Sequence, residues 1–135
     1  HPLSCATALA FLEALETEDL LSQATLLGNR LLEGLRHALA GVAPNVQDIR
    51  GRGLLVGIEL TEMDLKDCKN TTTRINNTTI GGKITASALA EGLIVLPAGI
   101  DGKVIELTPP AVISEEQIDF GIECLAKVIK IELAS

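Results

Sequence analysis

Aromatic side chains are nearly absent from this sequence of 135 residues. It contains two phenylalanines, Phe11 and Phe120, and neither tryptophan nor tyrosine. Modules that bind nucleic acid by stacking bases need aromatic side chains, so the scarcity argues against that class of protein. The formal net charge of −7 also disfavours a partner with a phosphate backbone. We therefore expect no nucleic-acid partner, and a core built from aliphatic side chains.

Long apolar runs are also missing, and so are the cysteine spacings of metal sites. No run approaches the roughly 20 apolar residues that span a bilayer. No signal peptide is visible at the amino end, so we expect no membrane partner. Cys5, Cys68 and Cys124 are widely spaced and odd in number, which favours a reduced, cytoplasmic setting over a disulfide framework. Matches to the N-glycosylation pattern at 70–79 point the other way, and we attribute them to local composition.

The sequence does have enough aliphatic material for one folded domain over residues 1–135. Hydrophobic residues make up 47% of the chain, and its length allows a core. The expected fold is α+β, a small, mainly antiparallel sheet with helices packed on one face. The chain opens at His1 without a methionine, which we interpret as a fragment or a processed product. Apolar periodicity, glycines and prolines predict the following order: helices at 3–16 and 18–40, strands at 46–49 and 54–60, a surface loop at 61–80, a helix at 82–91, strands at 94–96 and 103–107, and a last helix after Ser114.

Several local signals give finer expectations. Thr17 is predicted to cap the helix that follows it. Ser114, with Gln117 three residues later, fits the capping-box pattern at the start of the last helix. Residues 97–102 contain proline, glycine and aspartate and are expected to form a turn. Gly57, inside the second strand, would leave room for a neighbouring element.

No catalytic constellation stands out in the sequence. It has no metalloprotease HExxH motif, no CxxC pair, no phosphate loop and no recognisable serine, histidine and aspartate arrangement. Two single charges are the candidate site residues. Arg50 either binds a substrate carboxylate or phosphate, or forms an ion pair beside the turn. Glu106, between apolar neighbours on a strand, either faces solvent or lines a cleft shared with another domain.

Four segments in one order resemble a known family. They are residues 1–10 (HPLSCATALA), 48–60 (DIRGRGLLVGIEL), 92–99 (GLIVLPAG) and 104–119, which contains VIELTPP followed by ISEEQID. Together they resemble the C-terminal small domain of the class III aminotransferases, enzymes of fold type I that depend on pyridoxal phosphate. The family includes ornithine, acetylornithine and 4-aminobutyrate aminotransferases.

The resemblance implies a fragment that is not catalytic alone. In the family, the lysine that holds the cofactor lies in a large domain that would precede His1, so no catalytic and no cofactor-binding residue is expected here. The intact enzyme would bind pyridoxal 5′-phosphate and transfer an amino group between an amine or amino acid and a keto acid. Residues 1–16 would bridge to that large domain. The chain would form the substrate side of the cleft and support a homodimer.

Glu106 departs from the family pattern. Many members carry an arginine at this place, which grips the carboxylate of the substrate, and a glutamate would repel that group. A substrate with a cationic end would fit better, or a branch of the family that recognises the acid elsewhere.

Two functions of other classes stay open. Compact α+β domains often bind small regulatory molecules, and such a domain would need reversible ligand binding by these 135 residues alone. A structural or interaction module would bind neither cofactor nor substrate. We expect the isolated chain to expose an apolar face and to self-associate.

Overall fold

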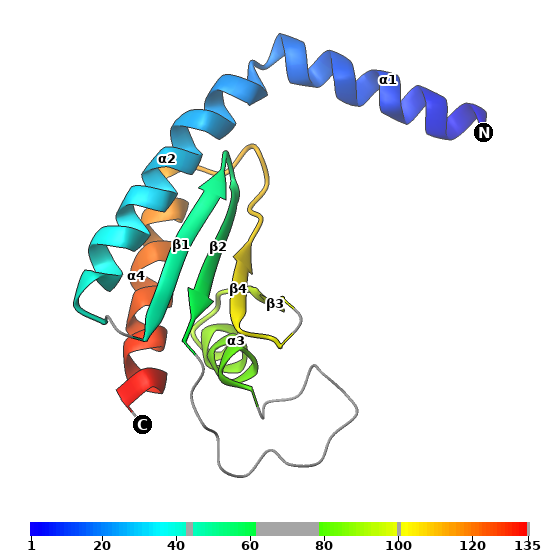
Figure 1. The fold of residues 1–135 in the computed structure, drawn as a ribbon. Coiled ribbons are helices and arrows are strands. Elements are labelled where there is room, and N and C mark those ends of the chain that lie inside the picture. Colours follow the sequence, from blue (N-terminus) through cyan, green and yellow to red (C-terminus); the bar gives the residue numbers. More distant parts are fainter. Residues whose placement is uncertain (43–44, 62–78, 100, 135) are drawn as a thin grey trace.

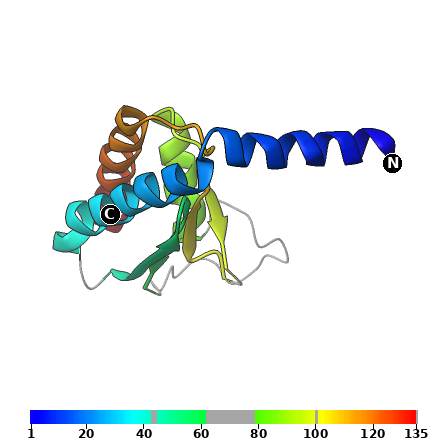
Figure 2. The ribbon, with the colours of Figure 1, turned by 90° about the horizontal axis from the view of Figure 1, so that it is seen from above.

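The computed structural model describes residues 1–42, 45–61, 79–99 and 101–134. Their elements confirm the predicted α+β fold, with a four-stranded sheet in the order β1-β2-β4-β3 and antiparallel pairing throughout. Figure 2 shows helices gathered over one face of this sheet. The elements are α1 (Pro2–Thr17), α2 (Leu20–Leu39), a 3₁₀ turn (Ala40–Val42), β1 (Val46–Arg52), β2 (Leu55–Leu60), α3 (Ile80–Ala90), β3 (Leu96–Ala98), β4 (Val104–Leu107) and α4 (Glu115–Ala134).

The core is aliphatic, as predicted from the scarcity of aromatics. Alternate residues of β2 and β4 point toward the helices, because side chains on a strand alternate between its two faces. Their partners come from α2, α3 and α4, whereas Phe11 and Phe120 are 60% and 55% exposed. The most deeply buried large side chains are Leu35, Val56, Ile58, Leu60, Ile84, Ile105, Ile118, Leu125 and Ile129.

A close approach between backbones fixes α2 against the β1–β2 turn. A Cβ atom added at Gly28 would lie 2.1 Å from the carbonyl oxygen of Gly53, so no larger residue fits without a backbone shift. Gly53 itself has a φ of 54°, in the left-handed region that favours glycine. The two glycines therefore allow the longest predicted helix to lie on the sheet.

Helix α1 stands apart from this core. It extends away from the rest of the chain in Figure 1, and none of its residues is buried. Its junction with α2 turns at Asp19, whose φ of 49° is left-handed. Four large apolar side chains of α1 are 55–69% exposed: Leu3, Leu9, Phe11 and Leu12.

The predictions at the helix ends had mixed outcomes. The capping box is confirmed, because the Ser114 backbone N–H donates to Gln117 Oε1 (3.0 Å) and the Gln117 N–H donates to Ser114 Oγ (3.2 Å). The Thr17 cap is wrong. Thr17 is the last residue of α1, and its hydroxyl donates to the Glu13 carbonyl at 2.8 Å. The Thr17 hydroxyl is therefore engaged in a hydrogen bond within α1 and does not cap α2 as predicted.

Two boundaries in the second half also differ from the prediction. The strand expected at 94–96 is Leu96–Ala98, so part of the predicted turn is strand. Pro97 is tolerated there because β3 is at the edge of the sheet, where a missing N–H breaks no ladder. Helix α3 begins at Ile80, inside the predicted loop, and Thr79 caps it by accepting from the Gly82 N–H at 3.0 Å. The rest of that loop, 62–78, lies outside the described residues.

Candidate functional site

The sheet has an uncovered face, opposite the helices. Register places Arg50 of β1 beside Gly57 of β2, Gly57 beside Glu106 of β4, and Glu106 beside Leu96 of β3. These four residues form a row across the sheet. The neighbours of Glu106 on its own strand, Ile105 and Leu107, are buried, so Glu106 belongs to the opposite face. The structure thus brings both predicted site residues onto one face, two strands apart.

Arg50 is already bound to two carboxylates. Its Nη1 donates to Asp48 Oδ2 at 3.0 Å and to the carboxylate of Glu59. The hydrogen bonds that Arg50 donates to Glu59 and Asp48 raise the pKa of Arg50 above its ordinary value. The cluster of one cation and two anions carries a formal excess of negative charge. A substrate carboxylate at this place would have to displace one of the two resident carboxylates.

Glu106 is different, because its side chain has no hydrogen bond or ion pair with any residue in the described ranges. It is half-buried between a neighbour without a side chain, Gly57, and the apolar Leu96. Partial burial removes some water from a carboxylate, which favours binding of a positively charged group beside it. Glu106 is therefore a half-buried carboxylate of this face that has no partner in the described part of the chain.

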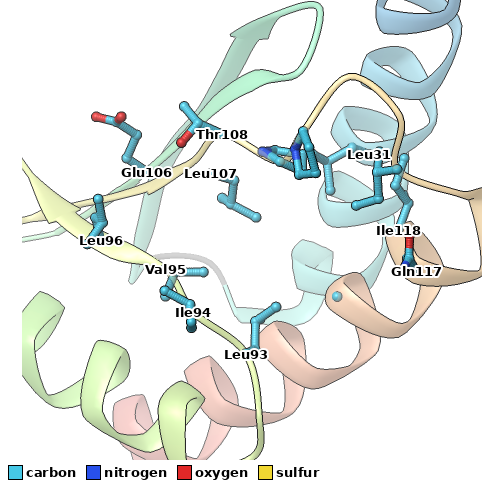
Figure 3. Close-up of a pocket in the computed structure, with 14 residues that line it drawn as sticks. Leu31, Leu93, Ile94, Val95, Leu96, Glu106, Leu107, Thr108, Gln117 and Ile118 are labelled. Atoms are coloured by element: carbon cyan, nitrogen blue, oxygen red, sulfur yellow. The ribbon is translucent and has the colours of Figure 1, made fainter.

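An apolar hollow of about 320 Å³ adjoins Glu106 (Figure 3). It lies between the β3–β4 edge, the segment that follows β4 and the start of α4. Its lining includes two further polar side chains, Thr108 and Gln117, and Gln117 is engaged in the capping box. In Figure 3 the carboxylate of Glu106 points away from Leu107, Ile118 and Gln117, in keeping with its place on the uncovered face of the sheet. Glu106 is the one charged residue among the fourteen that line it: Leu31, Leu93, Ile94, Val95, Leu96, Glu106, Leu107, Thr108, Pro109, Pro110, Ile113, Gln117, Ile118 and Gly121.

Sequence reasoning identified Glu106 but missed this hollow. A signal for it was present in the run Ile94, Val95 and Leu96, which was assigned wholly to a buried strand. Ile94 is 79% exposed and Leu96 is 57% exposed, so two of the three side chains face outward. Apolar side chains followed by the rigid Pro109 and Pro110 make a hollow that the helices do not fill.

The hollow does not fit pyridoxal phosphate. The cofactor is held through a lysine amine, and no lysine is among the lining residues. Two of the lysines in the described part make ion pairs, Lys127 with Glu91 at 2.8 Å and Lys103 with Asp101 at 3.6 Å. Among these same residues no group of three or more histidine, cysteine, aspartate or glutamate side chains could hold a metal ion.

The remaining reactive groups of the described residues make no second site. Cys5 and Cys124 are free thiols, and burial raises the pKa of the Cys124 thiol, which makes it a poor nucleophile. No helix in the described ranges is long and apolar enough to cross a membrane.

Comparison with known proteins points to one family. The profile of the family described as aminotransferase class-III matches residues 1–129. The 5-aminovalerate aminotransferase DavT of Pseudomonas putida is 34% identical over 131 residues, which cover 94% of this chain. The ornithine aminotransferase of Halalkalibacterium halodurans is 35% identical and covers 96% of it.

Solved structures show the same architecture. An aminotransferase from Bacillus anthracis superposes with a TM-score of 0.76 over 97% of this chain, at 35% identity. Ornithine delta-aminotransferase from Plasmodium falciparum gives a TM-score of 0.78 over the whole chain, at 29% identity.

The match covers only part of each relative. The chain spans 29% of the Pseudomonas protein, 27% of the Halalkalibacterium protein and 28% of the Bacillus structure. The relatives also differ in the substrate that their names give: 5-aminovalerate, ornithine, acetylornithine and 4-aminobutyrate.

Proposed function

This chain belongs to the class III aminotransferase family, and on that premise we propose that it is the C-terminal domain of a pyridoxal-phosphate-dependent aminotransferase. The whole enzyme would transfer the amino group of an amine or amino acid to a keto acid, leaving a carbonyl product and a new amino acid. The observation that carries the proposal is the family match over residues 1–129. The fragment would not be catalytic alone.

The chain's own part would be to shape the substrate side of the cleft. The family's enzymes use pyridoxal phosphate, which supplies the electrophilic aldehyde and the ring that stabilises negative charge during transfer. The lysine-free lining of the hollow gives no place for that group here, so its binding lysine is assigned to a domain outside these residues. Glu106 and Arg50 are the proposed substrate-side residues. Arg50 is already paired with Asp48 and Glu59, whereas Glu106 has no ion-pair partner in the described part of the chain.

The proposed partners follow from the incomplete match and from α1. The large cofactor-binding domain of the same polypeptide would cover the exposed apolar side chains of α1, including Leu9 and Phe11, so that residues 1–16 bridge the two domains. We propose a homodimer, with an amine donor and a keto-acid acceptor as the small-molecule partners and with neither nucleic acid nor membrane as a partner. A cytoplasmic location is in keeping with the free thiols of Cys5 and Cys124.

A non-catalytic binding module is the second candidate. The observation that favours it is the apolar hollow, which has the size of a small-molecule site and needs no cofactor. This function predicts that the isolated 135 residues bind an amine reversibly and that the natural polypeptide is colourless.

Amino transfer by the whole natural polypeptide tests the proposal. The purified protein is incubated with pyridoxal phosphate, a panel of amines and either pyruvate or 2-oxoglutarate, and the new amino acid is measured by chromatography. Formation of alanine or glutamate that stops when the cofactor is stripped supports an aminotransferase. No amino acid formed from any amine, together with reversible amine binding, supports the binding module instead.

A further inference from the structure

We propose that residues 3–12 of α1 are enclosed on two opposite sides in the whole protein, by the part of the same polypeptide that lies outside these 135 residues. The inference rests on the proposed function in one respect, which is that a further domain exists. A helix that only bridges two domains needs cover on one side. Enclosure on both sides would instead make this part of α1 an internal helix of the neighbouring domain.

One side of α1, the inner side, faces the domain described above. Ala14 and Leu15 are half-buried, and every other residue of the helix is exposed. Leu3 lies eleven residues before Ala14, and Phe11 lies four residues before Leu15, so all four belong to the inner side. Leu3 and Phe11 are nevertheless more than half exposed, because α1 extends beyond the rest of the chain (Figure 1).

The opposite side of α1, the outer side, is apolar as well. Leu9 and Leu12 follow Cys5 by four and seven residues, which is the spacing of one helix face. Both leucines are more than half exposed, and Cys5 is an exposed free thiol. No residue from Pro2 to Leu12 is charged. A surface helix has a polar side, whereas a helix that is apolar all round is typical of a protein interior.

Charge marks where the enclosure would end. Glu13 and Glu16 are the first acidic residues of the sequence, and Glu16 follows Cys5 by eleven residues on the outer side. An unpaired carboxylate is costly to bury, so we expect Glu16 to stay in water. Thr7, in the uncharged part, donates its hydroxyl to the Leu3 carbonyl at 2.7 Å, so its burial would leave no unpaired hydroxyl donor. Helix α1 is thus amphipathic beside this domain and apolar on both sides beyond it.

The length of the relatives argues for the rest of the polypeptide as the occupant. The matched part is 29% of the Pseudomonas protein and 27% of the Halalkalibacterium protein, so most of each relative's chain lies outside it. Residues 3–12 are all exposed, so nothing in the described part of this chain covers them. A second copy of the chain is the other source of apolar cover, and the experiment below separates the two.

Thiol labelling of the whole natural polypeptide tests the inference. Cys5 is a natural probe on the outer side, and Ser4→Cys adds a probe on the inner side, seven residues before Phe11. Glu16→Cys is the matched control for Cys5, on the same side and beyond the uncharged part. The folded protein reacts with N-ethylmaleimide, and mass spectrometry of the peptides gives the rate at each cysteine. Each rate is divided by the rate at the same position in urea.

We expect Cys5 and the thiol of Ser4→Cys to react at least about 100-fold more slowly in the folded protein than in urea, because access to them would require local unfolding. The thiol of Glu16→Cys should react within about 10-fold of its rate in urea, since it needs little or no opening. Cys5 should stay protected when the protein is diluted until sedimentation velocity shows monomers.

Each other outcome overturns a stated part of the inference. Rapid labelling of Cys5 would overturn enclosure of the outer side, and rapid labelling of Ser4→Cys would overturn enclosure of the inner side. Equal protection of Glu16→Cys and Cys5 would overturn the boundary at Glu13. Protection of Cys5 that is lost in the monomer would assign the outer side to a second copy and overturn the proposed occupant.

The labelling rates do not depend on activity, so this inference and the proposed function can fail separately. Rapid labelling of Cys5 in an enzyme that transfers amino groups would contradict this inference alone. A protected Cys5 in a longer polypeptide that transfers none would leave the enclosure of α1 standing and contradict the proposed function.

Discussion

Arg30 is the residue that most directly joins the two long helices. It donates from Nε to Asp119 Oδ1 at 2.9 Å and from Nη2 to Oδ2 at 2.7 Å, and its Nη1 lies 2.8 Å from Glu115 Oε2. Such bidentate pairs are more specific in geometry than single contacts. The hydrogen bond from Arg30 lowers the pKa of Asp119. All three side chains are exposed, so water and salt weaken the pair.

This pair makes the first prediction, on acid stability. A carboxyl group with a lowered folded-state pKa adds stability above its unfolded value, near pH 4, and that part is lost as the pH falls through the folded value. Arg30→Gln should therefore reduce the difference in unfolding free energy between pH 7 and pH 3, as measured by urea unfolding. Arg52→Gln, at an exposed position outside this pair, is the control. An acid dependence that is the same in Arg30→Gln as in the natural protein would contradict this prediction.

Ile58 gives the second prediction, on core packing. Its side chain is 0% exposed and belongs to the central strand β2, so truncation leaves a cavity that neighbours cannot fill. Ile58→Ala should cost about 2–5 kcal/mol of unfolding free energy in chemical denaturation. Leu89→Ala, at a side chain 61% exposed, is the matched control and should change stability by less than about 0.5 kcal/mol. Equal losses of unfolding free energy in the two variants would contradict the burial of Ile58 in the core.

At the scale of elements, the α2 contact with the β1–β2 turn gives the third prediction. Alanine is favoured over glycine in a helix by about 1 kcal/mol, so Gly28→Ala would stabilise an isolated α2. Here the added Cβ would lie 2.1 Å from a backbone oxygen, which no rotamer change can relieve. The steric clash should outweigh the gain in helix propensity. The free energy of unfolding should therefore fall by about 1–3 kcal/mol, as measured by thermal or chemical denaturation. Gly41→Ala, with nothing within 4 Å, is the control, and a stabilised Gly28→Ala would contradict the prediction.

Element types could be predicted well from the sequence, because they depend on local periodicity. The alternation that buries Val56, Ile58 and Leu60 is visible in the chain itself. Ends were harder to predict, because they depend on tertiary position. Pro97 predicts the end of a strand, but β3 tolerates it because β3 is an edge strand. Thr79 lies in the predicted loop, and only the structure shows that it caps α3.

The site shows the same division. Sequence alternation placed Glu106 away from Ile105 and Leu107, and the register then set it beside Gly57 and Leu96. The pairing of Arg50 with Glu59 depends on the register of the antiparallel strands β1 and β2, and the sequence predicted the antiparallel pairing but not the register. The hollow involves α2, β4 and α4 together, so the run from Ile94 to Leu96 could indicate only one of its walls.

At the scale of the whole molecule, α1 gives the fourth prediction. Its apolar side chains have no covering partner within the described structure, and four of them are more than half exposed. The isolated chain should therefore self-associate in sedimentation velocity and bind an apolar dye. A variant with Leu3, Leu9, Phe11 and Leu12 changed to serine should shift toward monomer while keeping the far-ultraviolet dichroism of the rest. A monodisperse natural chain with little dye binding would contradict this prediction.

The position of the cofactor lysine is the most direct test of the central claim, that these residues are one domain of a pyridoxal-phosphate enzyme. The measurement is borohydride reduction of the whole natural protein, followed by peptide mapping of the labelled lysine. We expect a yellow protein that bleaches on reduction, with the label on one lysine outside the 135 residues. A label on any lysine of these residues, namely Lys66, Lys69, Lys83, Lys103, Lys127 or Lys130, or a natural protein that takes up no cofactor, would contradict this prediction.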